Sequence, residues 1–338
     1  MKYREEQAAA KQYKKNYVDG LERVIQNRQQ SARTARRKYI KDVFERPQAY
    51  REDFKRMLGW PLVDHQNEGP PVCICEEIAR EDGYSVFRMQ FEILDGLQMT
   101  GLLFKTDGSE KKPLVIVQHG GLGTPELIAG FYGYTSNYND MLQRVRRQDV
   151  HVFAPQLLLW KEEYGVAFDR KVTDARLKRV GSSVAAIEIY GITRILDYFQ
   201  SQQYVSAFGM VGMSYGGFYA LYTAAIDTRI KSTVSCSFFN TRDNESRSDW
   251  TWFCSAERFD DAEIACLIYP RRLYIEIGSR DELFDCRFGK ESFAELQQLC
   301  GSIGTQWTEL IVFDGTHEFC TDDRPLQQLA DDLKQSAE

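Results

Sequence analysis

The sequence lacks the features that mark membrane and secreted proteins. Nowhere among its 338 residues do about 18 apolar side chains follow one another, so no membrane-spanning helix is expected. The chain opens MKYREEQAAAKQYKK, which contains neither the apolar core of a signal peptide nor a small-residue cleavage site. These absences predict a cytoplasmic protein that has no membrane partner.

The cysteines lack the spacing of a metal site. None of the eight forms a CxxC pair, and Cys73 and Cys75 make only a CxC pair, which is a weak indication of metal binding. In a reducing compartment we expect free thiols, packed mostly as small apolar side chains. The cysteine pattern therefore predicts no metal.

The chain has no large excess of charge of either sign, but its charges are unevenly distributed along the sequence. The formal net charge of −6 offers no footprint for a nucleic acid. Residues 1–60 carry a balance of +8 and the rest a balance of −14. We interpret the first segment as a solvated helical arm lying on an acidic body, its own or that of a neighbouring subunit, although such an arm could also contact another anionic partner.

The arm has a helical pattern. Apolar and aromatic residues recur at helical spacing through Tyr13, Tyr17, Leu21 and Val24, which suggests self-association into a homo-oligomer. A second helical stretch is predicted over 34–58, with a stop at the Gly and Pro of 59–61 and a polar, Pro-containing linker over 64–71. The domain prediction is a helical arm at 1–60 and a catalytic domain at 72–338.

From residue 72 onward, strand patterns come first and then alternate with helical ones. Strands are predicted at 72–78, 84–92, 97–105, 113–118, 149–154, 207–213, 229–236, 272–277 and 308–313. Helices are predicted at 138–147, 182–200, 216–226, 288–300 and 324–336. This order predicts an α/β fold, with a mostly parallel sheet covered by helices on both faces.

One motif in this region carries chemistry. An apolar strand runs into Gly-Met-Ser-Tyr-Gly at 212–216, and a helical pattern follows, which is the context of a nucleophile elbow. Gly212 and Gly216 leave room for the close approach of strand and helix in the tight turn between them. The motif predicts Ser214 as a nucleophile.

A serine nucleophile needs a base, and histidine is scarce. Of the four histidines, His65, His119, His151 and His317, the last alone follows Ser214, as the chain order of such triads requires. It comes just after an apolar, strand-like run. The acid is predicted as Asp281, on the turn after the strand at 272–277, where it would hold the imidazole tautomer. Glu282, Asp285 and, less favoured, Asp314 stay open as alternatives.

Acyl transfer also needs donors aimed at the developing oxyanion. We expect the backbone N–H of Tyr215, which follows the nucleophile, and that of Gly121, in the glycine-rich loop after an early strand. His119 in the same loop is interpreted as a structural residue rather than as a base. The loop lacks the third glycine of a dinucleotide-binding fingerprint.

Together these segments resemble the α/β-hydrolase superfamily. The residues concerned are His119-Gly-Gly, the elbow, Gly278-Ser-Arg-Asp281 and Thr316-His317-Glu-Phe. The stretch 261–273 is similar to the one before the acid strand in acetyl-xylan-esterase-like and dienelactone-hydrolase-like members. The resemblance covers about 85–336 and implies a Ser-His-Asp esterase without metal or organic cofactor. Ser214 departs from dienelactone hydrolases, which carry cysteine there, and from haloalkane dehalogenases, which carry aspartate.

Two long insertions, 156–180 and 238–262, are expected to overhang the site. The substrate-binding candidates in them are Trp160, Arg170, Trp250 and Trp252, whose aromatic faces would suit a sugar ring or would only pack a lid. The predicted function is hydrolysis of small carboxylic esters, with a short acyl group such as acetyl on a carbohydrate. A peptidase or amidase acting on small substrates, and a non-catalytic binding protein, stay open as alternatives.

Overall fold

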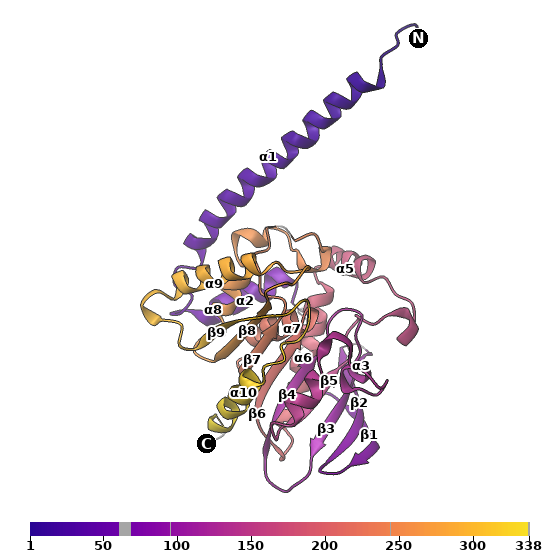
Figure 1. The fold of residues 1–338 in the computed structure, drawn as a ribbon, viewed down its shortest axis with the longest axis vertical. Helices are drawn as coiled ribbons and strands as arrows, with labels where there is room; N and C mark the ends of the chain where they lie inside the picture. The colour runs from indigo at the N-terminus through magenta and orange to yellow at the C-terminus, as the bar shows by residue number, and fades with distance from the viewer. Residues whose placement is uncertain (61–68, 95, 244, 337–338) are drawn as a thin grey trace.

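A nine-stranded sheet forms the centre of the molecule. The computed structural model describes residues 1–60, 69–94, 96–243 and 245–336. Within these ranges the strand order is β1-β2-β3-β5-β4-β6-β7-β8-β9, antiparallel from β1 to β5 and parallel from β5 to β9 (Figure 1). The strands are β1 (Cys73–Glu81), β2 (Tyr84–Leu94), β3 (Leu97–Thr106), β4 (Lys112–Gln118), β5 (His151–Pro155), β6 (Val205–Met213), β7 (Ile230–Cys236), β8 (Arg272–Gly278) and β9 (Thr308–Phe313).

All nine predicted strands are present, and their ends lie within three residues of the predicted ones. The reason is visible in β4, whose neighbouring side chains enter two different cores. Leu114 and Ile116 belong to one buried cluster, and Val115 and Val117 belong to the other. Because side chains alternate across a strand, a continuous apolar run marks a strand that is buried on both faces.

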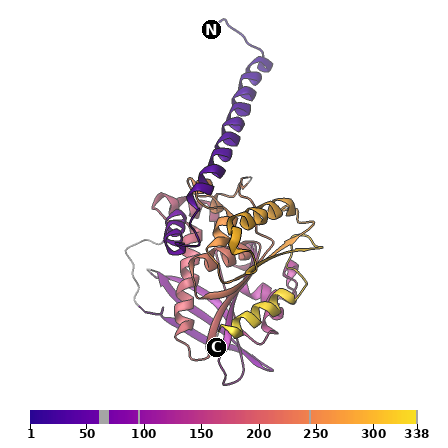
Figure 2. The same cartoon turned by 90° about the vertical axis from the view of Figure 1, so that its left-hand side faces the viewer.

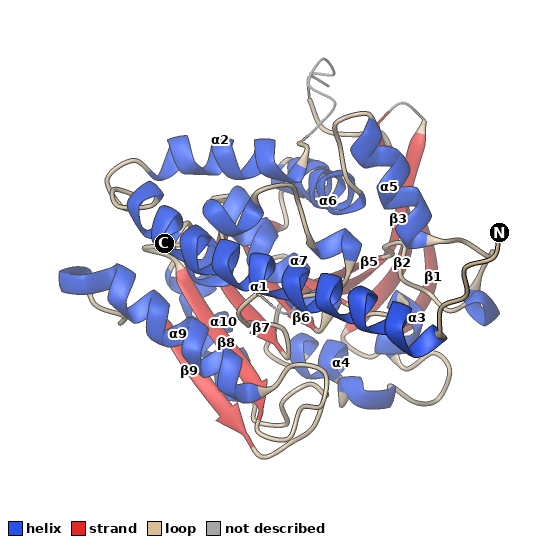
Figure 3. Cartoon of the chain, turned by 90° about the horizontal axis from the view of Figure 1, so that it is seen from above, coloured by secondary structure: helices blue, strands red, loops and turns tan. Residues whose placement is uncertain are grey.

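Helices cover both faces of the sheet. The first core lies under α2 (Pro47–Leu58), α6 (Val184–Gln200), α7 (Tyr215–Ile226), α8 (Asp261–Cys266) and α9 (Cys286–Cys300), and the second under α3 (Pro125–Ala129), α4 (Met141–Arg146) and α10 (Arg324–Gln335). Figure 3 shows α2 and α6 on one side of the strands and α4 on the other. The five helices predicted after residue 72 are observed. The short α3 and α8, and α5 (Arg170–Arg179), were not predicted.

The amino-terminal segment is not the uniform arm that the sequence suggested. Helix α1 (Gln7–Tyr39) is long and projects from the body, as Figures 1 and 2 show. The predicted helix over 34–58 is wrong at its start, because α1 continues to Tyr39, turns follow, and α2 begins at Pro47. Proline favours the first position of a helix, since its missing N–H needs no partner there.

Helix α2 belongs to the body. Its side chains Tyr50, Phe54 and Leu58 are buried in the first core. Gly59 ends the helix with a φ of 81°, and a Cβ there would lie 2.6 Å from the Cα of Ser182. The boundary between arm and body therefore falls within α1 rather than at residue 60. The predicted linker lies mostly outside the described residues, as does His65.

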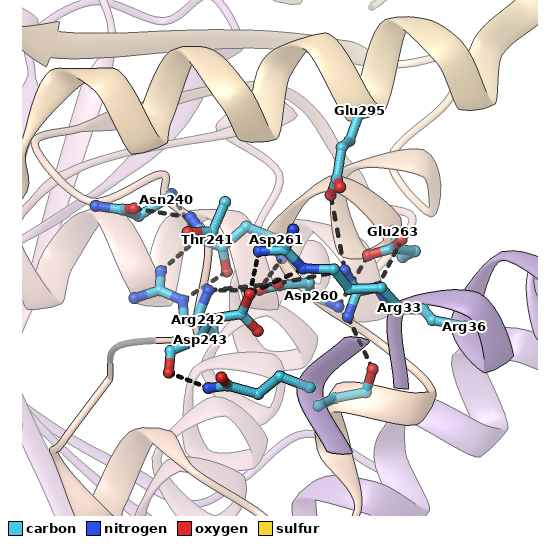
Figure 4. A network of polar contacts seen from close by, with 12 residues as sticks. Arg33, Arg36, Asn240, Thr241, Arg242, Asp243, Asp260, Asp261, Glu263 and Glu295 are labelled. Carbon is cyan, nitrogen blue, oxygen red and sulfur yellow. Dashed lines mark hydrogen bonds and ion pairs between the residues drawn. The ribbon is translucent and has the colours of Figure 1, made fainter. Parts of the chain in front are cut away.

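The carboxyl-terminal end of α1 is held by an ionic network (Figure 4). Arg36 is buried, and its Nε donates to Oε1 of Glu263 at 2.9 Å. Its guanidinium also lies 3.6 Å from Asp260 and 3.7 Å from Glu295. One turn earlier, Arg33 pairs with Asp243. A cation at the last turn of a helix also complements the helix dipole, so this end of α1 is the part that is fixed.

The cysteines are free thiols in the structure. Cys236, Cys266, Cys300 and Cys320 are buried, whereas the other four are partly or fully exposed. The described residues contain no group of three or more His, Cys, Asp or Glu side chains that could hold a metal ion. None of the helices within the described ranges is long and apolar enough to cross a bilayer.

Candidate active site

Ser214 sits in the sharp turn between β6 and α7. Its φ of 59° and ψ of −122° are unusual for a residue with a side chain. A Cβ on Gly212 would lie 2.1 Å from the carbonyl oxygen of Gly216, and one on Gly216 would lie 2.1 Å from that of Gln118. Both glycines are therefore required by the close approach of strand and helix. The strain is held in place partly by the Ser214 N–H, which donates to the Cys236 carbonyl at 2.9 Å.

His317 and Asp281 meet at the ends of β9 and β8. Nδ1 of His317 lies 2.9 Å from Oδ2 of Asp281. The other oxygen, Oδ1, accepts the backbone N–H groups of Leu283 at 2.8 Å and Phe284 at 2.9 Å. The ring of Phe284 stacks on the imidazole at 5.6 Å between centroids. A buried carboxylate with these three partners fixes the proton on Nδ1 and leaves Nε2 free to act as a base.

The rival acids lie elsewhere. Asp285 accepts from the N–H of Arg287 at the start of α9 and pairs with that arginine. Asp314 is exposed and pairs with Arg280 at 3.1 Å. Glu282 is exposed as well. Of the four candidate acids, Asp281 alone contacts His317 in the described structure.

The loop after β4 lies against the elbow. A Cβ on Gly120 would be 3.1 Å from the Cβ of Ser214, and one on Gly121 would be 3.2 Å from the ring of Tyr215. Tyr215 is the first residue of α7, where an N–H has no acceptor within its own helix. Within the described ranges, the N–H of Gly121 likewise makes no backbone hydrogen bond. The residues predicted as oxyanion donors thus lie beside Ser214 with their N–H groups available.

His119 holds this loop, as predicted. Its Nδ1 donates to the Gly120 carbonyl at 2.9 Å, and Nε2 accepts the N–H of Leu157 at 3.3 Å. Complete burial lowers the pKa of the imidazole to about 4, so the ring is neutral near pH 7. A neutral ring with both nitrogens engaged is a structural element.

A cavity of about 360 Å³ opens above Ser214 and His317. It is lined by residues from seven segments of the chain: Gly120, Gly121, Leu122, Leu127, Tyr134, Ser136, Asn137, Tyr138, Lys161, Tyr164, Met213, Ser214, Tyr215, Arg247, Trp250, Leu283 and His317. The two long insertions each supply part of the wall, Lys161 and Tyr164 from one and Arg247 and Trp250 from the other. The volume suits a small organic molecule.

Three of the four predicted substrate-binding residues are placed elsewhere. Trp160 and Trp252 line other hollows. Arg170 is nearly buried beneath the site, where it pairs with Asp249 at 2.6 Å and with Glu188 at 3.0 Å. A cation with two buried carboxylate partners serves to fix the insertion, so its prediction as a substrate ligand is corrected. Trp250 alone of the four lines the cavity.

Several residues at the site carry no sequence signal. The hydroxyl of Tyr138 accepts the N–H of Gly120 at 2.9 Å and so fixes the loop after β4. Nδ2 of Asn137 donates to the carbonyl of His317 at 2.8 Å and ties His317 to the same segment. Asp249 accepts from the hydroxyl of Tyr215 at 2.9 Å. These residues lie in two single 3-10 turns, Ser136–Tyr138 and Ser248–Trp250, that carry no motif, and only the folded chain brings them together.

The sequence of this chain is similar to that of a bacterial protein. No protein-family model matches the chain. It is 31% identical over 193 residues to a protein of Bacillus subtilis (strain 168) named "Putative hydrolase YtaP", and the match covers 53% of this chain and 63% of that protein. The match therefore spans less than two thirds of that relative.

Solved structures of esterases are similar in fold. A "putative acetyl xylan esterase" from Bacteroides fragilis NCTC 9343 superposes with a TM-score of 0.64 at 16% identity, covering 79% of this chain and 74% of that one. A glucuronoyl esterase from Solibacter usitatus gives a TM-score of 0.61 at 14% identity, covering 84% and 92%. The chain thus has the α/β-hydrolase fold, with an additional amino-terminal helix.

Proposed function

We propose that this protein hydrolyses small carboxylic esters through an acyl-enzyme formed on Ser214. The observation that carries the proposal is the pairing of His317 with the buried Asp281, in the same cavity wall as a strained serine. Backbone strain costs stability and is found mostly at functional sites, and a histidine oriented by a carboxylate is suited to proton transfer, so both features favour catalysis.

The first half of the reaction forms the acyl-enzyme. Oγ of Ser214 attacks the ester carbonyl while Nε2 of His317 takes its proton. Asp281 stabilises the imidazolium that results. The C–O bond to the alcohol then breaks, and the alcohol leaves with the proton that His317 returns to it. In the second half, water attacks the acyl group while His317 accepts its proton; the bond to Oγ of Ser214 then breaks, His317 returns the proton to Oγ, and the acid is released.

The negative charge of each tetrahedral intermediate falls on the former carbonyl oxygen. The N–H groups of Tyr215 and Gly121 are the donors for this oxygen. Tyr138 and His119 act on the reaction indirectly, because they fix the loop that carries Gly121. Loss of either contact would leave the nucleophile intact and misplace a donor.

The lining of the cavity supports a small, uncharged or anionic substrate. Lys161, Arg247 and the base His317 are the ionisable nitrogen groups of the lining, and none of the described lining residues is acidic. A cationic alcohol would therefore find no counter-charge. The rings of Tyr134, Tyr164 and Trp250 offer apolar faces to a sugar ring. Together with the two esterase neighbours, this favours a short acyl group, such as acetyl, on a carbohydrate.

An ester panel tests the proposal. Aryl acetates, butyrates and octanoates are offered first, followed by acetylated sugars and choline esters. We expect turnover of the short acyl esters, little turnover of the cationic alcohols, and loss of activity in Ser214→Ala with the fold retained. Unchanged hydrolysis by Ser214→Ala would refute the mechanism.

The same panel separates the alternatives. A peptidase or amidase would also cleave aminoacyl anilides, whereas the proposed esterase would not. A non-catalytic binding protein would hydrolyse none of the substrates. Circular dichroism of each sample shows that a silent protein is folded, so absence of turnover then counts against the proposal.

A further inference from the structure

The projecting part of α1 carries an apolar surface that no other part of the described chain covers. Its exposed members, here called the stripe, are Tyr13, Tyr17, Val18, Leu21, Val24 and Ile25. At 100° per residue, these six side chains fall within about 140° of the helix circumference. Tyr13 and Tyr17 are each 73% exposed. Helices in proteins are stabilised mostly by packing of an apolar face, so an uncovered apolar stripe on this one indicates a partner.

The stripe is continuous with a surface that is already an interface. Ala32 and Arg36 lie on the same face of α1, about two and three turns beyond the stripe, and both are buried against the body. Contact with the body begins at Gln29, whose side chain donates to the carbonyl of Asp243 at 2.6 Å. One face of the helix thus packs on its own body at one end and is uncovered at the other.

We infer that the stripe binds the stripe of a second copy of this chain, with the two helices antiparallel and Tyr17 at the two-fold axis. In this register Tyr13 faces Leu21 of the partner copy, and Ala10 faces its Val24. Glu6 and Arg28 lie on the same face of the helix and oppose each other across the pair. Both side chains are exposed in the single chain. In this register Tyr13 and Ala10 therefore meet apolar partners and Glu6 meets Arg28, while Lys14, which lies on the same face, meets Gly20 of the partner copy.

The length of the helix agrees with this arrangement. With Tyr17 on the axis, the first helical residue, Gln7, lies opposite Asn27 of the partner copy. Asn27 lies two residues before Gln29, where contact with the body begins. Each helix therefore fills the free length of the other, about 33 Å, without meeting the body.

A parallel pair does not fit these surfaces. It would place Lys14, Glu6 and Arg28 each opposite its own copy, so that like charges meet along the seam. It would also place both bodies at the same end of the pair. There, each helix already packs Ala32 and Arg36 of the same face against its own body. An isologous antiparallel contact keeps the two bodies at opposite ends.

Sedimentation velocity of the full chain over a concentration series tests the inference. We expect a dimer, and we expect Leu21→Glu to raise its Kd at least 100-fold, since a charge enters the apolar seam twice. Gln26→Lys on the opposite face is the matched control and should leave the Kd unchanged. A monomeric wild-type chain, or a larger assembly insensitive to Leu21→Glu, would overturn the proposal.

Charge reversal tests the register. Glu6→Arg and Arg28→Glu each create two like-charge contacts in the antiparallel pair, and each should raise the Kd roughly tenfold at low salt. The double variant restores opposite charges and should recover wild-type affinity. Equal Kd values for both single variants and the wild type would rule out this register. Ester hydrolysis is measured on the same samples; since the arm holds no catalytic residue, failure of dimerisation leaves the proposed function untouched.

Discussion

The elbow around Ser214 and the free end of α1 are opposite extremes of one chain. At the elbow almost every group is buried, and a single added Cβ would meet backbone at 2.1 Å. Along the first turns of α1 the side chains face water, and a Cβ on Gly20 would meet nothing closer than the Arg23 guanidinium at 3.8 Å. Within a single chain, tertiary packing therefore determines the first region, whereas only contacts along the helix itself act on the second.

The largest effect is expected where the buried region holds the catalytic base. Asp281→Asn keeps the shape of the side chain but removes the charge that fixes the imidazole. We expect kcat to fall by about 10⁴, with the fold unchanged. The matched control is Asp285→Asn, whose carboxylate only pairs with Arg287 at the surface. Equal kcat values for the two variants would show that Asp281 is not the triad acid.

The ionic network around Arg36, which fixes the end of α1 to the body, offers the second test of the difference between the two regions. Arg36→Met leaves Glu263 and Asp260 buried without their cation, so we expect the free energy of unfolding to fall by about 3–5 kcal/mol. Arg37→Met changes the neighbouring arginine, which is 64% exposed on its side chain and 3.9 Å from Glu295. Its effect should stay within about 0.5 kcal/mol. Chemical denaturation compares the two, and similar losses would mean that the network does not fix the helix.

The same substitution, glycine to alanine, should lower stability in one of the two regions and raise it in the other. Gly216→Ala forces Gln118 and the elbow apart, so we expect a loss of about 3 kcal/mol in stability and of most activity. Gly20→Ala removes a flexible residue from an open helix and should stabilise that helix by about 0.5–1 kcal/mol. Thermal unfolding and amide exchange measure both. Destabilisation by Gly20→Ala would indicate that α1 is closely packed at this point.

The smallest effect is expected at His151, a buried histidine that lies away from the active site. Burial lowers the pKa of His151 to about 4, and its Nδ1 accepts the N–H of Thr106 at 3.1 Å. The unfolded chain binds this proton near pH 6.5 and the folded chain only near pH 4, so stability is full above 6.5 and falls with pH between these values. The slope from this group is at most about 1.4 kcal/mol per pH unit. Denaturation of His151→Asn should show a shallower loss over the same range.

The sequence was most informative where burial is most complete. Continuous apolar runs such as 113–118 predicted strands buried on both faces, and the spacing of Gly212, Ser214 and Gly216 predicted the turn that the structure contains. Asp281 and His317 could be predicted to meet because each follows a strand of the same sheet. Chain order and strand ends are local properties, so a sequence can show them.

The residues that only tertiary packing positions were predicted poorly. Trp160, Trp252 and Arg170 were expected in the cavity because they lie in the insertions, but position in an insertion does not fix the direction of a side chain. Tyr138 and Asn137 went unnoticed for the same reason. The joint between α1 and the body was also misplaced, because nothing in the basic pattern of 33–41 distinguishes the buried Arg36 from the exposed Arg37.

The central claim is that Ser214 is a nucleophile activated by His317. Its most direct test is reaction of the full chain with a fluorophosphonate, followed by mass spectrometry of the peptides. The account predicts one adduct, on Ser214, which disappears in Ser214→Ala and forms much more slowly in His317→Gln. Absence of an adduct in the folded protein, or an adduct on another residue, would contradict it.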